Sequence, residues 1–149
     1  MSSNDYKELI SKFIDKYGED ELAGYLDVRL STPERTLTLI GNNGTHKIPP
    51  EFLHGEVFAV TSGSLQLGTK EEIHAEYKEA LARLIEKLKE KPWRKVYFVP
   101  TGPTTLVLQI KVVVYNILRI STVDLFYSKG HYMELDMDYR EILDSIKNS

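Results

Sequence analysis

Two loops rich in hydroxyl and glycine residues each follow an apolar run and precede a helical pattern. One consists of Thr101, Gly102, Pro103, Thr104 and Thr105, and the other, 61–69, includes Thr61, Ser62, Gly63, Ser64 and Thr69. A helix after such a loop directs unpaired N–H groups at a ligand, glycine lets the backbone approach it, and hydroxyls bond phosphate or ribose oxygens. If the preceding strands are neighbours, both loops lie at one edge of a sheet. The pattern predicts a cleft for a polyanionic or nucleotide ligand.

The same residues also have a purely structural explanation. Glycine supplies a positive φ at a tight turn, and threonine caps the helix that follows. Neither loop contains the GxxxxGK[ST] or GxGxxG pattern of known phosphate-binding loops. The loop residues alone therefore leave both ligand binding and ordinary strand-to-helix turns open.

Alternating and helical patterns predict the elements that hold these loops. Short apolar runs bounded by turn residues predict strands at 56–60, 95–99, 122–127 and 131–136. Amphipathic spacing predicts helices at 70–91 and 138–147. The order from residue 56 to residue 127 is that of a βαβαβ unit, whose crossovers are right-handed. We therefore expect an α/β protein with a Rossmann-like, mainly parallel sheet flanked by helices.

The segment 106–118 fits two structures. As a strand, Leu106, Leu108 and Ile110 alternate with other residues, and the β-branched content favours this structure. As a helix, Leu106, Ile110 and Val114 form one apolar stripe. The length of the segment and the crossover that a parallel sheet requires both favour the helix, so we predict a helix over 104–118.

The first 50 residues predict an extension of this domain. Apolar residues recur at helical spacing over 4–17, and a second short helix is predicted over 20–26. Alternation over 35–40, a Gly41-Asn42-Asn43-Gly44 turn signal and the two prolines at 49–50 predict a β-hairpin over 35–48. A winged DNA-binding module shares this order, but no basic cluster marks a recognition helix. We expect an extension at 1–50 and a Rossmann-like domain at 51–149, packed as one compact unit.

Composition narrows the classes of function. The chain of 149 residues carries 19 basic and 22 acidic residues, which gives a net charge of −3 and no general footprint for duplex nucleic acid. It has no cysteine, and its four histidines do not have metal-ligand spacing, so we expect no metal and no cofactor. The N-terminus lacks a signal-peptide pattern, and polar residues interrupt the longest apolar stretch. We expect a cytoplasmic protein that does not bind membranes.

The run VYFVPTGPTTLVLQI resembles the strand and ligand loop of the CRISPR-associated Rossmann fold (CARF) sensors and the related SAVED domains. CARF domains commonly carry a TGGTK-like motif here, which corresponds to residues 101–105. Pro103 replaces a glycine, and Thr105 replaces the lysine that would contact ligand phosphate. The turn at 129–132 resembles the continuation of SAVED domains after their own loop. The resemblance covers roughly residues 55–140.

The resemblance implies a protein that binds a cyclic oligoadenylate second messenger in a homodimer cleft during antiviral signalling. Loops 61–69 and 101–105 would face the ligand. Some stand-alone proteins of this kind are ring nucleases, which cleave the messenger without a metal by placing the ribose 2′-hydroxyl in line with the scissile phosphate. Lys70, Lys129 and His131 are then the charged candidates for catalysis. The alternatives are a non-catalytic Rossmann-like interaction module, whose segment 106–118 forms an oligomer interface, and a small-nucleotide enzyme.

Overall fold

The computed structural model describes residues 2–31, 35–44 and 47–148, and it divides the chain into two compact units, Met1–Pro33 and Glu34–Ser149. The first unit contains the helices α1 (Ser3–Tyr17) and α2 (Glu19–Ser31). Gly18 separates the two helices with a φ of 91°, which side chains other than glycine rarely adopt. Both predicted helices are confirmed, and α2 continues five residues beyond its predicted end at residue 26.

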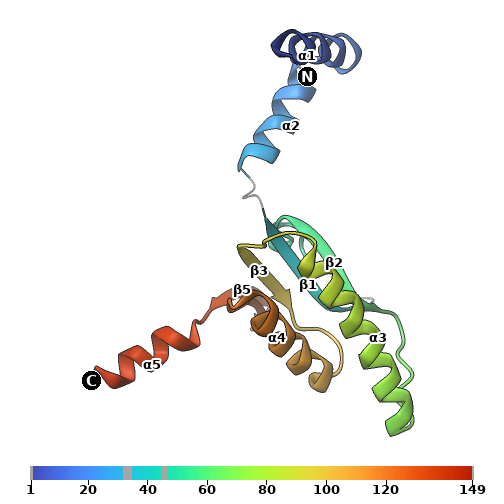
Figure 1. Cartoon of the computed structure of the whole chain (residues 1–149), viewed down its shortest axis with the longest axis vertical. Helices are drawn as coiled ribbons and strands as arrows, with labels where there is room; N and C mark the ends of the chain where they lie inside the picture. The colour runs from blue at the N-terminus through green and yellow to red at the C-terminus, as the bar shows by residue number, and fades with distance from the viewer. Residues whose placement is uncertain (1, 32–34, 45–46, 149) are drawn as a thin grey trace. The chain divides into compact units, whose positions relative to one another are not determined.

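The second unit is built on a five-stranded sheet (Figure 1). Its strands are β1 (Thr36–Asn43), β2 (Glu56–Ser62), β3 (Lys95–Val99), β4 (Val123–Ser128) and β5 (His131–Asp136). Its helices are α3 (Lys70–Lys89), α4 (Thr104–Leu118), α5 (Tyr139–Lys147) and the short 3-10 helix η1 (Pro50–Phe52). The predicted strands and helices from residue 56 onward are all confirmed to within two residues at each end.

The strand order is β2-β1-β3-β4-β5. Strands β1 to β4 run parallel, and only β5 runs antiparallel, beside β4. This mainly parallel sheet with flanking helices confirms the predicted Rossmann-like α/β fold. Because parallel strands end at the same edge, the loops after β1, β2 and β3 all lie at the carboxyl edge of the sheet.

The hairpin predicted over 35–48 is wrong. Residues 36–43 do form a strand, but β1 lies between β2 and β3, with Leu39 opposite Phe58 on one side and Phe98 on the other. With parallel neighbours on both sides, β1 has no edge at which a following strand could fold back. Residues 47–49 have no strand structure, and Thr45 and His46 lie outside the described residues. The strand therefore belongs to the centre of the sheet, where its six buried positions fit.

Helices α3 and α4 lie side by side on one face of the sheet (Figure 1). They form the main core with that face, using Leu84 and Leu88 of α3 and a stripe of Leu106, Ile110 and Val114 on α4, all at most 1% exposed. This four-residue spacing confirms that segment 106–118 is a helix, because a strand would place these residues and Leu108 on the same face. Leu108 is 56% exposed instead.

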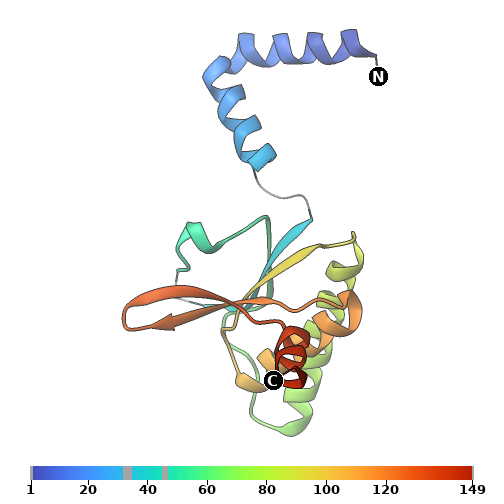
Figure 2. The same cartoon turned by 90° about the vertical axis from the view of Figure 1, so that its left-hand side faces the viewer.

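The opposite face of the sheet is covered mainly by a connecting segment rather than by helices (Figure 2). Ile48, Phe52 and Leu53, from the connection that contains η1, pack on the buried residues Ile40, Val99 and Leu125. The connection is fixed at its end by Thr38, whose hydroxyl accepts from the His54 backbone N–H at 2.8 Å and donates to the His54 carbonyl at 2.6 Å. Among the described helices, none is both long and apolar enough to span a bilayer.

A charged cluster at the start of β2 ties this strand to α3. Glu56 accepts from Lys87 at 2.7 Å and from Lys91 at 2.6 Å, and these hydrogen bonds lower the pKa of Glu56 from 4.5 to about 2. Lys87 also lies over the Phe58 and Trp93 rings. Because the Glu56 side chain is 44% exposed in both of these ion pairs, the cluster stabilises the fold by less than about 1 kcal/mol.

We expect a small loss of stability in acid that depends on Glu56. A pKa that is lower in the folded state means that the stabilisation is complete above about pH 4.5 and is lost as the pH falls toward 2. A Glu56→Gln variant should be less stable than the wild type at pH 7, and this difference should shrink below about pH 4.5 and be lost as the pH falls through about 2. Urea unfolding followed by fluorescence of Trp93, the single tryptophan, checks this. A difference that stays constant over this pH range would contradict the assignment.

Candidate functional site

Strands β2 and β3, which lead into the two hydroxyl-rich loops, are not neighbours. The end of β1 lies between them, and its Asn42 connects to both loops. Thr101 accepts a hydrogen bond from the Asn42 backbone N–H at 3.0 Å and donates to the Asn42 carbonyl at 2.7 Å. On the other side, the Asn42 side-chain Nδ2 donates to the Gly63 carbonyl at 3.1 Å. The two loops therefore share one edge of the sheet through β1 and not through direct adjacency.

The hydroxyl of Thr61 is also used within the protein. Thr61 is buried, and its Oγ1 lies 2.7 Å from the Gly41 carbonyl and 3.1 Å from Asn42 Oδ1. Together with Thr101, it fixes the end of β1 from both sides. Two of the hydroxyls that the sequence assigned to a ligand thus hold the sheet edge together.

The glycines at this edge permit close packing of backbone segments. A Cβ on Gly41 would lie 2.2 Å from the Thr101 carbonyl oxygen, and a Cβ on Gly102 would lie 2.9 Å from the Asn42 Cβ. Gly102 also has a φ of 99°. Packing alone therefore explains why threonine and glycine stand at positions 101 and 102. This agrees with the purely structural explanation of the loops, which needs no ligand.

The loop 61–69 is closed by side chains of its own helix. Thr69 caps α3 by accepting from the Glu72 backbone N–H at 3.1 Å, which confirms the predicted cap. Glu72 accepts from the Gly68 N–H at 3.2 Å, and Glu76 accepts from the Gln66 N–H at 3.3 Å. These carboxylates occupy backbone donors that an anionic ligand would use. Ser62 and Ser64 are exposed on the same loop.

The start of α4 has open donors. Pro103 occupies the N-cap position and supplies no side-chain hydrogen bond. Within the described part of the chain, the N–H groups of Thr104, Thr105 and Leu106 have no acceptor. The first turn of a helix carries a partial positive charge, so this end of α4 favours an anion.

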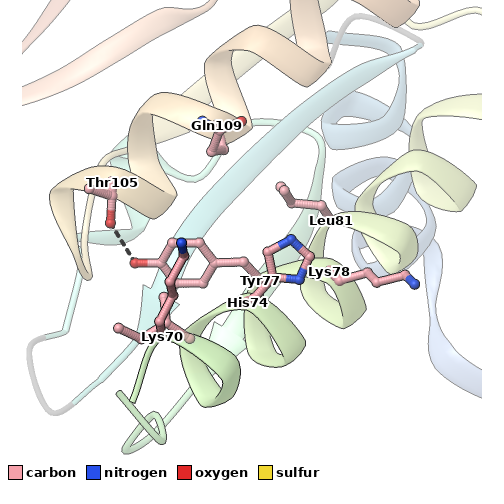
Figure 3. A pocket seen from close by; sticks show the side chains of 8 residues that line it. Lys70, His74, Tyr77, Lys78, Leu81, Thr105 and Gln109 are labelled. Atoms are coloured by element: carbon pink, nitrogen blue, oxygen red, sulfur yellow. Dashed lines mark hydrogen bonds between the residues drawn. The ribbon is translucent and has the colours of Figure 1, made fainter. Parts of the chain in front are cut away.

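A pocket of about 490 Å³ opens between the N-terminal halves of α3 and α4 (Figure 3). Its lining consists of Lys70, Ile73, His74, Tyr77, Lys78 and Leu81 from α3 and Thr105 and Gln109 from α4. The Tyr77 hydroxyl and Thr105 Oγ1 are 2.6 Å apart, so this hydrogen bond joins the two helices across the pocket. The structure thus brings together two residues that the sequence singled out, Lys70 and Thr105.

The pocket is lined by basic groups and by no carboxylate. Lys70, His74 and Lys78 follow one another at a spacing of four, which places them in a column along one side of α3 (Figure 3). Among the described residues, neither Lys70 nor Lys78 forms an ion pair. Both lysine side chains carry a positive charge, so a bound anion would interact favourably with them. Sequence reasoning missed this column, although the spacing of four was a visible signal.

Lys129 and His131 lie elsewhere: Lys129 is in the turn between β4 and β5, and His131 is the first residue of β5. Phe98 lies opposite Asp124, so β4 continues for about 10 Å past the end of β3 before the turn begins. Figure 2 shows this hairpin projecting from the sheet as a two-stranded arm. Both residues are exposed, and neither lines the pocket that contains Lys70. The structure therefore does not gather the three predicted catalytic residues in one pocket.

The described residues contain no group of three His, Asp or Glu side chains that could hold a metal ion. The fold and the site define a Rossmann-like α/β domain with a basic pocket near the carboxyl edge of its sheet. Comparison of the chain with protein-family models, with curated proteins and with solved structures finds no match.

Proposed function

We propose that this protein binds a cyclic oligoadenylate second messenger, with one nucleotide unit in the pocket between α3 and α4. The main observation behind this proposal is the chemistry of the pocket lining. It includes two lysines that form no ion pair with the described residues, a histidine, and no carboxylate. A phosphate is the anion that such a lining and an open helix N-terminus both favour. Among phosphate-containing ligands, we choose a cyclic oligoadenylate because residues 96–110 resemble the ligand loop of CARF sensors.

The parts of a nucleotide have matching surfaces in the pocket. Lys70 and the start of α4 are the donors for a phosphate, and Thr105 and Gln109 are available to ribose or base edges. Ile73, Tyr77 and Leu81 supply the apolar and aromatic surface on which a base packs. The volume of about 490 Å³ falls within the usual range for small-molecule sites but is too small for a whole cyclic oligonucleotide. The proposal therefore includes a second copy of the chain, which binds another part of the ring in a homodimer.

Cleavage of the ligand is a separate proposal, and the residues of the pocket limit which side chains could take part in it. A metal-independent ring nuclease needs a group that handles the proton of the 2′-hydroxyl or of the leaving oxygen. Of the pocket residues, His74 has that chemistry, and Lys70 can stabilise the developing charge. The roles predicted for Lys129 and His131 would require the β4–β5 turn of a second copy to reach the ligand.

We expect one ring size among cyclic tri-, tetra- and hexa-adenylate to raise the melting temperature of the full chain. Binding to the folded state stabilises it by an amount that grows with the logarithm of the ligand concentration, about 2.7 kcal/mol at a hundred times the dissociation constant. Thermal unfolding with each ring size tests this, and chromatography of the mixtures shows whether linear products form. Linear adenylate of the same length serves as the control. Absence of a shift with all three rings would overturn the proposal.

A second candidate function is a protein-interaction module. The observation in its favour is the outer side of α4, where Leu108 and Val112 are 56% and 53% exposed and Tyr115 lies on the same side. Apolar side chains gathered on one exposed helix face are typical of interaction surfaces. A module of this kind would form oligomers without nucleotide and would show no stabilisation by any cyclic oligoadenylate.

A further inference from the structure

The sheet has one protected edge and one open edge. At the β2 edge, Arg83 of α3 donates to the Val60 carbonyl at 2.9 Å and so occupies an edge acceptor. At the other edge, β5 pairs with β4 on its inner side, and the described residues place no strand on its outer side. β5 contains no proline, glycine or lysine, which are common means of preventing an edge strand from pairing.

The turn before β5 determines which backbone groups are open. It consists of Lys129 and Gly130, whose φ values of 51° and 80° fit a two-residue type I′ turn. Such a turn is closed by a hydrogen-bonded pair, here Ser128 and His131, and hydrogen-bonded and non-hydrogen-bonded pairs then alternate along the hairpin. The N–H and C=O groups of Tyr132, Glu134 and Asp136 therefore face outward.

Exposed apolar side chains surround this edge. Met133 lies opposite Phe126, and the two are 43% and 50% exposed; Leu135, on the same face, is 37% exposed. This is the face toward α4, because Asp124, opposite Leu135, forms an ion pair with Lys111 of α4. Helix α5 follows β5, and its Arg140 donates to the Arg119 carbonyl at 2.9 Å.

We propose that β5 pairs antiparallel with β5 of a second copy across a two-fold axis at Met133, so that two sheets join into one. The occupant is a second copy because the edge can pair with itself over five strand residues, 131–135, without placing like charges opposite one another. Outward-facing residues must lie opposite one another, so the axis can fall at Tyr132, Met133, Glu134 or Leu135, and an axis at Tyr132 pairs only strand residues 131–133. An axis at Glu134 places Glu134 opposite its own copy, and an axis at Leu135 places Glu134 opposite Asp136, both like-charged pairs.

The register centred on Met133 avoids these pairs. It places Tyr132 opposite Glu134 and His131 opposite Leu135 of the other copy, with the two Met133 side chains adjacent at a non-hydrogen-bonded position. Such positions bring side chains closest together, with Cα atoms about 4.5 Å apart. Met133, Leu135 and Phe126 of both copies then form one continuous apolar surface on the α4 side.

This contact does not rest on the proposed ligand. Strand β5 lies at the opposite edge of the sheet from β2, the strand that α3 packs against, so the pairing leaves the pocket accessible. The homodimer contact proposed around the ligand is separate from this pairing. We therefore expect the protein to be a dimer before any nucleotide is added.

Single-cysteine variants test the register in the nucleotide-free full chain, because the natural sequence contains no cysteine. Under mild oxidation, Met133→Cys should give mostly disulfide-linked dimer, since the expected Cα separation allows the bond. Leu135→Cys is the matched control: in this register its two copies are about 13 Å apart and should remain unlinked. Equal linking of both variants, or linking of neither, would overturn the proposal.

A second pair of variants tests the open edge by light scattering. Glu134→Pro removes only an outward N–H, which the β4–β5 ladder does not use, so the hairpin should persist while the dimer is lost. Glu134→Ala removes the same contact with His54 but keeps the N–H, so it should remain a dimer. A monomeric wild-type protein, or a dimeric Glu134→Pro variant with an unchanged circular dichroism spectrum, would show that copies do not join through β5.

Discussion

A Gly41→Ala variant is expected to lose about 3 kcal/mol or more of unfolding free energy. The added Cβ would lie 2.2 Å from the Thr101 carbonyl oxygen, and both atoms belong to segments whose positions are fixed. Relief requires β1 and the loop after β3 to separate, which breaks the two hydrogen bonds between Thr101 and Asn42. Urea unfolding followed by Trp93 fluorescence measures this loss, because Trp93 is buried in the core of the sheet unit.

The matched control is Gly44→Ala, three residues along the same segment. A Cβ there would meet no atom within 4 Å, so its stability should stay within about 0.5 kcal/mol of the wild type. Comparable losses in the two variants would mean that glycine flexibility, and not the close approach of β1 to Thr101, determines the result. A stable Gly41→Ala variant would contradict the packing of the carboxyl edge.

The double variant Lys70→Ala/Lys78→Ala is expected to bind the preferred cyclic oligoadenylate about 100-fold more weakly. A hydrogen bond to a charged group contributes about 1.5 kcal/mol or more, and 1.4 kcal/mol corresponds to a tenfold change in affinity. Neither lysine makes an ion pair within the described residues, so their removal should leave the fold intact. Isothermal titration of each single variant and of the double variant measures the effect.

Lys89→Ala provides the control for general electrostatics, because Lys89 is exposed on the same helix but does not line the pocket. Its affinity should stay within a factor of two or so of the wild type. Equal weakening by Lys89→Ala would indicate attraction by overall charge instead of contact in the pocket. Thr101→Ala is a poor probe of binding, because it also removes the hydroxyl that ties β3 to β1.

Local sequence patterns predicted most elements correctly because their periodicity matched the faces that become buried. The stripe of Leu106, Ile110 and Val114 predicted α4 although β-branched residues favoured a strand, and the need for a crossover in a parallel sheet agreed with that choice. Thr69 was likewise predicted to cap a helix and residues 95–99 to form a strand, and both predictions are confirmed.

The position of β1 could not be predicted from local signals. A turn sequence such as Gly41-Asn42-Asn43-Gly44 is typical of hairpins, but here Gly41 serves a close contact with Thr101, 60 residues later in the chain. Asn42 was missed for the same reason, since its partners lie in two other loops. The six buried positions of β1 reflect a central strand, and no pattern within residues 35–48 distinguishes that from a hairpin with one buried face.

The candidate site was predicted only in part. Thr105 was named as a loop residue and Lys70 as a catalytic candidate that the CARF resemblance implies. Both line the pocket, whereas its other lining residues were assigned no role. His74 was assigned no role, and it lies off the apolar stripe of α3. That position is what places it beside Lys70 and Lys78, in a hollow that exists only because α4 packs next to α3.

The central claim is that a cyclic oligoadenylate binds between α3 and α4. Amide chemical-shift mapping of isotope-labelled full-length protein, titrated with the ring size that stabilises it, tests this claim most directly. We expect the largest shifts at the start of α4, in Thr104, Thr105 and Leu106, and along α3 from Lys70 to Lys78. Shifts confined to other parts of the chain, or no shifts at saturating ligand, would contradict it.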